Sequence, residues 1–177
     1  MNLESFALNR DEITELIQGK NLIEGYFDLE VQLTPNGFDL TAGSIFEFEK
    51  GGALDFSNKE RAVPAGREII PQRENPQDKF GWWRLKEGAY KIITNEKINL
   101  PKDLIALAFS RTSLLRMGAF TQHGVWDAGF KGRSEFVLVV ENPSGIRLKQ
   151  NARVAQLIFL RIKESRHSYQ GIYQAEA

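Results

Sequence analysis

Apolar and polar residues alternate in short runs along most of the chain, a period typical of β-strands. Residues 45–49, Ile-Phe-Glu-Phe-Glu, alternate strictly, as a half-exposed strand should. Four further runs are apolar or β-branched, at 89–94, 104–109, 136–140 and 154–160. Turn residues (Gly, Pro, Asn) separate the runs, at 50–52, 64–66, 99–101 and 142–145. Many short strands with turns at this spacing predict an all-β fold, a sandwich or a barrel.

The N-terminal segment, residues 1–25, has a different period. Asn9 and Glu12 stand at the spacing of a capping box, and apolar residues follow at helical spacing: Ile13, Leu16 and Ile17. Gly19 is well placed to end this helix. The pattern therefore predicts one amphipathic N-terminal helix before the strands.

We expect a single domain over residues 1–177, because no repeat or linker divides the chain. Residues 73–79, RENPQDK, are the most loop-like internal stretch. Trp82 and Trp83 follow it, and adjacent strand residues face opposite ways. One tryptophan is therefore expected in the core and the other at a rim or a subunit contact. Residues 165–177 are polar and aromatic at their end and predict a docking arm.

Composition excludes several classes of protein. Lysine plus arginine equals aspartate plus glutamate, 23 each, so no global field attracts a polyanion and we expect no nucleic-acid partner. The chain has no cysteine and two histidines, too few for a typical zinc site. No signal peptide or membrane-length apolar run is evident in the sequence. We expect no membrane partner and a cytoplasmic protein.

The first candidate for chemistry is Arg111-Thr112-Ser113, which follows the strand 104–109. It opens a short segment, 113–117, that Gly118 can terminate. Two hydroxyls and a guanidinium at the start of a helical turn can converge on phosphate oxygens. The alternative is that Thr112 and Ser113 are simple helix caps, which taken alone is the commoner case.

Asp127 lies among large apolar residues at the bend of an expected hairpin, in GVWDAGF. A carboxylate there is costly unless it is hydrogen-bonded or has a task, such as taking a proton from water. The alternative is an aspartate that caps its own turn.

Gln156 interrupts an apolar strand that begins after Arg153, and a buried glutamine needs a partner. That partner could be a phosphate, another subunit or a neighbouring strand. Asp39, in Asn36-Gly37-Phe38-Asp39, could hold a magnesium ion through water. Taken by itself, this segment predicts only a turn.

The order of these segments resembles the trimeric dUTPase and dCTP deaminase superfamily. That superfamily has a GYDL-like segment, an RSSL segment, an ID-x-x-[YWF]-x-G hairpin and an [RI]-[AG]-QL strand. The corresponding segments here are 36–40, 111–114, 126–132 and 153–157. The resemblance covers roughly residues 33 to 174. It implies a distorted β-barrel or jelly roll and a homotrimer with active sites at the subunit interfaces.

The resemblance also implies roles for individual residues. Asp127 would activate the attacking water, and Asp39 would support the magnesium-bound triphosphate through water. Phe130 would pack beneath the deoxyribose, and the backbone of Gly124 and Val125 would read the uracil edge. The other residues expected to bind substrate are Arg111, Thr112, Ser113, Arg116, Gln156, Tyr169 and Gln174. The expected substrate is a deoxyribonucleoside triphosphate, with Mg²⁺ as cofactor.

Two reactions are open. In the deaminase branch a glutamate lies ten residues after the hairpin aspartate, and here that position is Val137. Glu135 would share its strand face and could act only if a β-bulge shifted the register. The run WDAGFKGRSE with NARVAQLIF after it most resembles archaeal dUTPases, so hydrolysis of dUTP to dUMP and pyrophosphate is favoured.

Some features favour the alternatives to a simple dUTPase. The glycine-rich RGxGGFG arm of familiar dUTPases is missing, and the tail around Tyr169 and Gln174 resembles the deaminase type. Arg116 also matches deaminase and archaeal forms. Deamination of dCTP, alone or followed by hydrolysis, therefore stays open. A non-catalytic, regulatory nucleotide-binding homologue is the third hypothesis.

Overall fold

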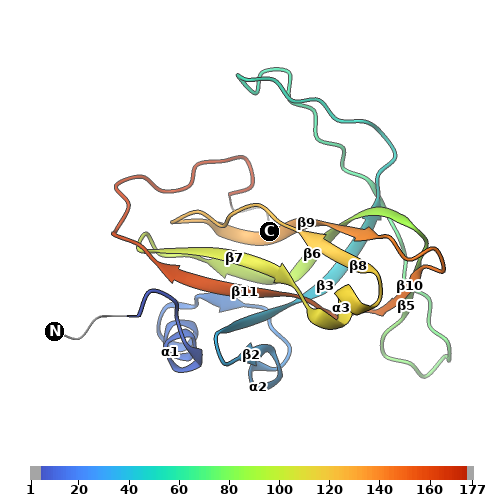
Figure 1. Cartoon of the computed structure of the whole chain (residues 1–177), viewed down its shortest axis with the longest axis horizontal. Coiled ribbons are helices and arrows are strands. Elements are labelled where there is room, and N and C mark those ends of the chain that lie inside the picture. Colours follow the sequence, from blue (N-terminus) through green and yellow to red (C-terminus); the bar gives the residue numbers. More distant parts are fainter. Residues whose placement is uncertain (1–4, 175–177) are drawn as a thin grey trace.

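The computed structural model describes residues 5–174, and one antiparallel sheet dominates it (Figure 1). Six strands form its main path, in the order β7-β11-β3-β6-β9-β8. Their bounds are Leu104–Ser110 (β7), Arg153–Arg161 (β11), Gly37–Glu47 (β3), Gly88–Asn99 (β6), Lys131–Val140 (β9) and Ala119–Gln122 (β8). Three two-residue strands pair beside this path: β1 (Ile23–Glu24) with β6, and β2 (Leu33–Thr34) and β4 (Arg67–Glu68) with β3.

The two ends of this path meet, so the sheet nearly closes into a barrel. Ser110 at the end of β7 accepts a hydrogen bond from the backbone of Thr121 on β8 at 2.8 Å. The backbones of Ala106 and Trp126 exchange hydrogen bonds at 3.0 and 3.1 Å. A second, two-stranded sheet pairs β5 (Trp82–Leu85) with β10 (Ile146–Lys149). The expected all-β, barrel-like fold is confirmed.

Alternation of side chains builds the core. On β9 and along most of β6 the even-numbered residues are buried, as a period of two requires. Trp83 is 1% exposed and its indole N–H donates to the carbonyl of Ile69 at 2.7 Å. Trp82 stays half-buried under the guanidinium of Arg147. One tryptophan is therefore in the core and the other at a rim, as predicted.

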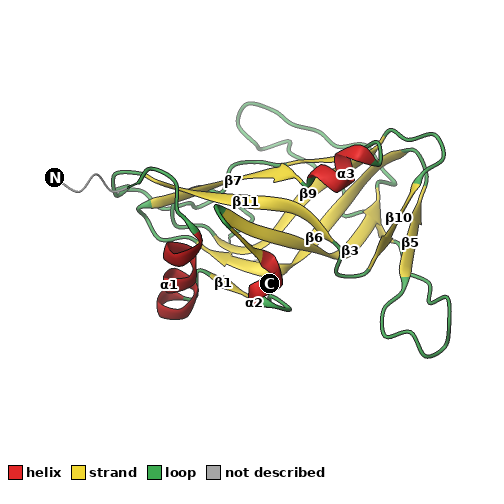
Figure 2. Cartoon of the chain, turned by 60° about the horizontal axis from the view of Figure 1, so that its bottom comes forward, coloured by secondary structure: helices red, strands yellow, loops and turns green. Residues whose placement is uncertain are grey.

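Three helices in residues 5–174 flank the sheet (Figure 2). They are α1 (Arg10–Lys20), α2 (Leu29–Gln32) and α3 (Thr112–Arg116). Both hydrogen bonds of the Asn9–Glu12 capping box are present, which confirms the predicted start of α1. The predicted end at Gly19 was wrong, because α1 continues to Lys20. Asn21 then adopts the left-handed conformation with φ 52°, and its backbone N–H donates to the carbonyls of Leu16 and Ile17.

Strand β3 also differs from expectation. The alternating run 45–49 overlaps it only at residues 45–47, because β3 begins at Gly37 and ends at Glu47. Pro35 and Asn36 alone form the turn, and Asp39 lies within the buried first half of the strand. A side chain on Gly37 would place its Cβ 2.4 Å from the carbonyl of Leu157. Glycine is therefore needed where β3 passes β11 so closely.

Two long loops leave the barrel in different directions (Figure 1). Residues 48–66 connect β3 to β4 and extend far from the body (Figure 1). Residues 73–79 form no helix or strand, which confirms the predicted loop. In the segment 5–174, no helix has the length and apolar character needed to cross a membrane.

The C-terminal segment folds back on its own chain. The backbone N–H of Tyr169 donates to the carbonyl of Ala128 at 2.9 Å. The side-chain amide of Gln174 donates to the carbonyl of Gly129 and accepts from the N–H of Lys131, both at 3.2 Å. These contacts bring the expected docking arm onto the 123–130 loop of the same subunit, as far as residue 174. Its last three residues lie outside the described part of the chain.

Candidate active site

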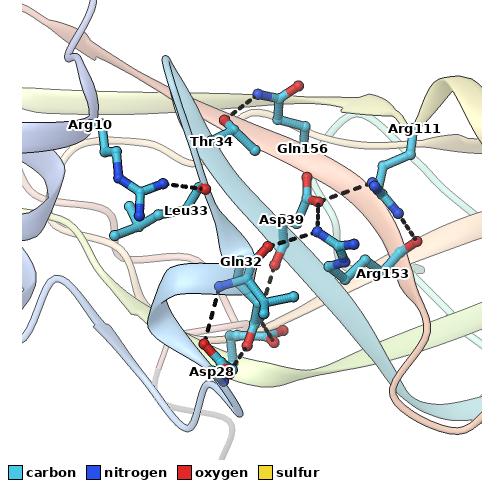
Figure 3. A network of polar contacts seen from close by, with 11 residues as sticks. Arg10, Asp28, Gln32, Leu33, Thr34, Asp39, Arg111, Arg153 and Gln156 are labelled. Carbon is cyan, nitrogen blue, oxygen red and sulfur yellow. Dashed lines mark hydrogen bonds and ion pairs between the residues drawn. The ribbon is translucent and has the colours of Figure 1, made fainter.

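Five polar residues from separate parts of the chain form one cluster, called here the arginine site (Figure 3). They are Thr34, Asp39, Arg111, Arg153 and Gln156. The Oδ2 atom of Asp39 lies 3.0 Å from Nε of Arg111 and 3.1 Å from Nη1 of Arg153. The amide of Gln156 donates to the hydroxyl of Thr34 at 2.6 Å. Two of the expected phosphate-binding residues, Arg111 and Gln156, are thus brought to one place.

Strand pairing creates this cluster. Gln156 on β11 is directly opposite Asp39 on β3. The backbone N–H of Arg111 donates to the carbonyl of Val154 at 3.1 Å, which extends the pairing of β7 with β11 by one residue. The side chain of Gln156 therefore has a structural partner, Thr34, within the chain. Arg153 was noted in the sequence only as a flank of the strand, and its contact with Asp39 had no local signal.

Asp39 is nearly inaccessible, at 2% exposure. Burial raises the pKa of its carboxyl group, because the charged form loses hydration, and the charges of Arg111 and Arg153 limit that rise. Both guanidinium groups remain partly accessible, with their side chains 29% and 34% exposed. The cluster therefore presents positive charge to solvent and keeps its single carboxylate inside.

Helix α3 starts beside the arginine site. Its N-cap residue is Arg111, and no side chain caps the helix. The hydroxyls of Thr112 and Ser113 are exposed and make no hydrogen bond to any of residues 5–174. The alternative that they serve as caps was therefore wrong. Arg116 is exposed on the last turn of the same helix, and Gly118 follows with φ 72°.

A cavity of about 420 Å³ lies elsewhere, between the 123–130 loop and the outer face of β6 and β9; we call it the hairpin pocket. Its lining includes four of the residues expected to bind substrate: Gly124, Val125, Phe130 and Tyr169. The rings of Phe130 and Tyr169 meet edge to face with centroids 5.5 Å apart. Tyr169 of the C-terminal segment thus packs against Phe130 and fixes its ring. The fixed ring offers a platform for a flat or ring-shaped ligand.

Asp127 lies in the loop between two pocket-lining residues, Trp126 and Phe130. Its side chain is exposed, while Trp126 and Ala128 on either side are buried. The expectation of a costly carboxylate among apolar groups was wrong, because the chain turns Asp127 outward at this bend. The backbone N–H of Phe130 donates to the carbonyl of Asp127 at 3.0 Å and closes the turn.

Glu135 lines the hairpin pocket, and its carboxylate pairs with Nζ of Lys91 at 3.3 Å. Lys91 also lies over the ring of Phe46. Val137 is half-buried on the same face of β9, two residues further along. The register of β6 with β9 shifts between Ile93 and Lys97, so the irregularity adds residues to β6 rather than to β9. Glu135 thus reaches the pocket without taking the position of Val137.

A buried polar network contacts the arginine site through the backbone of Asp39. Glu96 is 0% exposed and accepts hydrogen bonds from the amide of Gln32 at 2.7 Å and from the backbone N–H of Thr41 at 2.9 Å. The same amide of Gln32 donates to the carbonyl of Asp39. Burial raises the pKa of Glu96. No sequence pattern indicated this network, because Gln32 ends the short helix α2 and the other members lie in ordinary strands.

The described residues do not fit a metal ion held by the protein. Within residues 5–174 there is no group of three or more Asp, Glu, His or Cys side chains near enough to share one. The carboxylate of Asp39, the expected support of a magnesium ion, contacts two guanidinium groups instead. A metal is favoured by carboxylates free of competing cations. The metal role of Asp39 stays a prediction from the sequence.

The arginine site and the hairpin pocket are separate in one subunit. None of the five residues of the arginine site is among those that line the pocket. The arginine site joins β3, β7 and β11, whereas the pocket lies over β6 and β9. The residues expected to bind phosphates and those expected to bind the base are therefore not adjacent within this chain.

Comparisons with known proteins agree on one family. The dCTP deaminase-like family model matches residues 7–162. The probable deoxyuridine 5'-triphosphate nucleotidohydrolase of Methanosarcina mazei is 44% identical over 171 residues, which are 96% of each chain. The deoxyuridine 5'-triphosphate nucleotidohydrolase of Methanocaldococcus jannaschii is 35% identical over 90% of this chain and 99% of its own.

A solved structure supports the same fold. The 2'-deoxycytidine 5'-triphosphate deaminase of Agrobacterium tumefaciens superposes with a TM-score of 0.64 and 22% identity. The match covers 88% of this chain and 48% of that one. The ordered segments, the nearly closed barrel and the close relatives agree, and the chain belongs to the dUTPase and dCTP deaminase superfamily.

Proposed function

We propose that this protein hydrolyses dUTP to dUMP and pyrophosphate. The observation that carries the proposal is the 44% identity, over 96% of both chains, with a relative named as a probable deoxyuridine 5'-triphosphate nucleotidohydrolase. The two regions described above supply the chemistry such a substrate needs. One offers positive charge for phosphates, and the other offers an aromatic platform with backbone groups for a base.

The arginine site is proposed to bind the phosphate chain. Arg111 and Gln156 contact it, and the exposed hydroxyls of Thr112 and Ser113 at the start of α3 add donors. Arg116 on the same short helix contributes a further positive charge. Guanidinium groups suit this task because their planar donor sets match phosphate oxygens in pairs.

The hairpin pocket is proposed to bind the nucleoside. Backbone groups of Gly124 and Val125 read the uracil edge, and Phe130 packs beneath the deoxyribose. Tyr169 holds Phe130 in place, and Gln174 fastens the C-terminal segment to the loop. A buried hydrogen-bonding edge separates uracil from cytosine strongly, since the wrong base leaves polar groups unpaired.

Asp127 is proposed as the general base. Its exposed carboxylate takes a proton from water as the water oxygen bonds to the α-phosphorus atom, and the bond to the leaving pyrophosphate breaks. The guanidinium groups stabilise the charge that gathers on the phosphate oxygens. Attack at the α-phosphorus yields dUMP and pyrophosphate, the products proposed here.

A direct assay tests the reaction. The purified protein is mixed with magnesium and either dUTP or dCTP, and pyrophosphate and ammonia are measured separately. We expect pyrophosphate from dUTP and no ammonia from dCTP. Ammonia from dCTP would support the second hypothesis, deamination alone or followed by hydrolysis, for which the position of Glu135 in the pocket is the favouring observation. Nucleotide binding without either product would favour a regulatory homologue.

The role of Asp127 has a sharper test. Asp127→Asn should bind a non-hydrolysable dUTP analogue as the parent does but lose turnover by about a thousandfold or more, because a base acts mainly in the transition state. Asp78→Asn is the matched control: it removes the same charge from the 73–79 loop, and its turnover should equal that of the parent. Equal turnover in Asp127→Asn would remove this residue from the mechanism.

The separation of the two regions supports a homotrimer with sites shared between subunits. We expect light scattering to give three times the mass of one 20.1 kDa chain. Asp127→Asn and Arg111→Ala are each expected to be inactive alone. Subunits of the two variants, unfolded, mixed and refolded together, should regain part of the activity, because some interfaces then combine one intact Asp127 with one intact Arg111. A monomer, or mixtures as inactive as their components, would contradict shared sites.

A further inference from the structure

The contacts of Asp39 differ from those of a carboxylate that holds a metal. Its Oδ2 atom is shared by Nε of Arg111 at 3.0 Å and Nη1 of Arg153 at 3.1 Å. Two further bonds hold the same guanidinium groups to the backbone. Nη1 of Arg111 donates to the carbonyl of Arg153 at 3.3 Å, and Nη1 of Arg153 donates to the carbonyl of Val31 at 2.7 Å.

These bonds engage Nε and Nη1 of Arg111 and only Nη1 of Arg153. Each group has five N–H donors in a rigid plane. Nη2 of Arg111 and both Nε and Nη2 of Arg153 make no hydrogen bond to residues 5–174. The two side chains are about one third exposed, whereas the side chain of Asp39 is 3% exposed. The unused donors therefore belong to the accessible side chains of the cluster.

Two adjacent guanidinium groups repel each other, and this arrangement needs a compensating charge. Asp39 supplies that charge from the interior, so the trio keeps a net charge of about +1 by simple counting of its groups. Asp39 is itself fixed, because its backbone carbonyl accepts from the buried amide of Gln32 at 2.9 Å. The network that contains Glu96 thus anchors the carboxylate that aligns the two arginines.

We infer that Asp39 is a positioning residue that aligns Arg111 and Arg153 as a paired binding unit for a polyphosphate, and that Arg153 contacts the phosphates beside Arg111. This inference takes the substrate class, a nucleoside triphosphate, from the proposed function. It replaces metal support by Asp39 with a role that operates without a metal. Asp39 touches the arginines and acts on the substrate only through them.

Binding without metal separates this role from metal support. Inorganic tripolyphosphate and a non-hydrolysable dUTP analogue are titrated into the parent and Asp39→Asn by calorimetry, once in EDTA and once in magnesium. We expect Asp39→Asn to bind each ligand about tenfold or more weakly in both conditions, which is the size expected for losing one charged hydrogen bond. Support of a metal predicts a loss in magnesium alone. Charge counting alone predicts tighter binding, since a negative charge is removed.

The matched control is Asp28→Asn. Asp28 is an exposed carboxylate that caps α2 close to the same cluster, and asparagine caps helices equally well. Its affinity for both ligands should stay within about twofold of the parent's, as expected for a change outside the binding contacts. Asp39→Asn that binds as tightly as the parent in EDTA would overturn the inference.

A second variant covers the case in which Asp39→Asn fails to fold. Arg153→Lys keeps the charge of a partly exposed side chain but loses the planar pair of donors. We expect it to bind tripolyphosphate several-fold more weakly in EDTA, with unchanged circular dichroism and thermal melting. Affinity equal to the parent's would remove Arg153 from the anion site and overturn the inference.

The outcome is independent of the proposed reaction. A parent that releases pyrophosphate from dUTP while Asp39→Asn binds normally in EDTA would leave the function standing and the positioning role refuted. A parent that releases no pyrophosphate but binds tripolyphosphate through Asp39 would leave the positioning role standing and the function refuted.

Discussion

Acidification should destabilise the fold through His123, the first residue after β8. Its ring packs edge to face against Phe136 with centroids 4.5 Å apart and lies 5.8 Å from the ring of Trp126. The Nε2 atom is buried and has no hydrogen-bond partner among residues 5–174. Burial lowers the pKa of His123 from 6.5 to about 4, and a hydrogen bond to the backbone of Ala108 opposes this only in part.

The sign follows from proton linkage. Because the folded pKa is depressed, the unfolded chain binds the proton more readily between about pH 6.5 and pH 4. The free energy of unfolding is therefore unaffected by His123 above that window and falls as the pH drops through it. At about pH 5 the expected loss is about 2 kcal/mol, from about one and a half pH units at about 1.4 kcal/mol each.

Urea unfolding of the parent and of His123→Phe, at about pH 7.5 and about pH 5, measures the loss in free energy of unfolding. The protein concentration is held constant, because subunit association affects stability. The parent should lose about 2 kcal/mol more than the variant. Asp39 and Glu96, whose pKa values are raised, favour the folded state at low pH in both proteins and cancel in the comparison. His167→Phe, at the exposed second histidine, is the control and should behave as the parent does. Equal losses in the parent and His123→Phe would refute the reasoning.

Two further substitutions test the fold around the candidate site. Glu96→Ala should lower the free energy of unfolding by about 3 kcal/mol in urea titrations, because it leaves the buried donors of Gln32 and Thr41 without an acceptor; a loss below about 1 kcal/mol would contradict the importance of this network. Gly129→Ala should speed tryptic cleavage of the C-terminal segment, because Gly129 has φ 81° and a Cβ there would lie 2.9 Å from Cβ of Ser168. Unchanged cleavage would mean that the segment is not fastened at this point.

Local interactions explain what the sequence predicted well. The capping box joins Asn9 to Glu12, only three residues apart. The sequence therefore predicted the start of α1 correctly. The end of α1 was not readable, because Gly19 and Asn21 both suit a helix end, and the structure has the left-handed residue at Asn21. The apolar run 136–140 lies within β9, so a strand was predictable there. The order of the four family segments indicated the superfamily, although each segment alone was ambiguous.

Only the tertiary structure decided how these pieces act together. Asp39 and Arg153 are separated by 114 positions, and pairing of β3 with β11 makes them neighbours. Lys91 meets Glu135 through the register of β6 with β9, which no local pattern contains. The sequence by itself determined the strand period, the first helix and the family. Strand register determined which charges meet, because a shift of one residue would turn each of these side chains to the opposite face of the sheet.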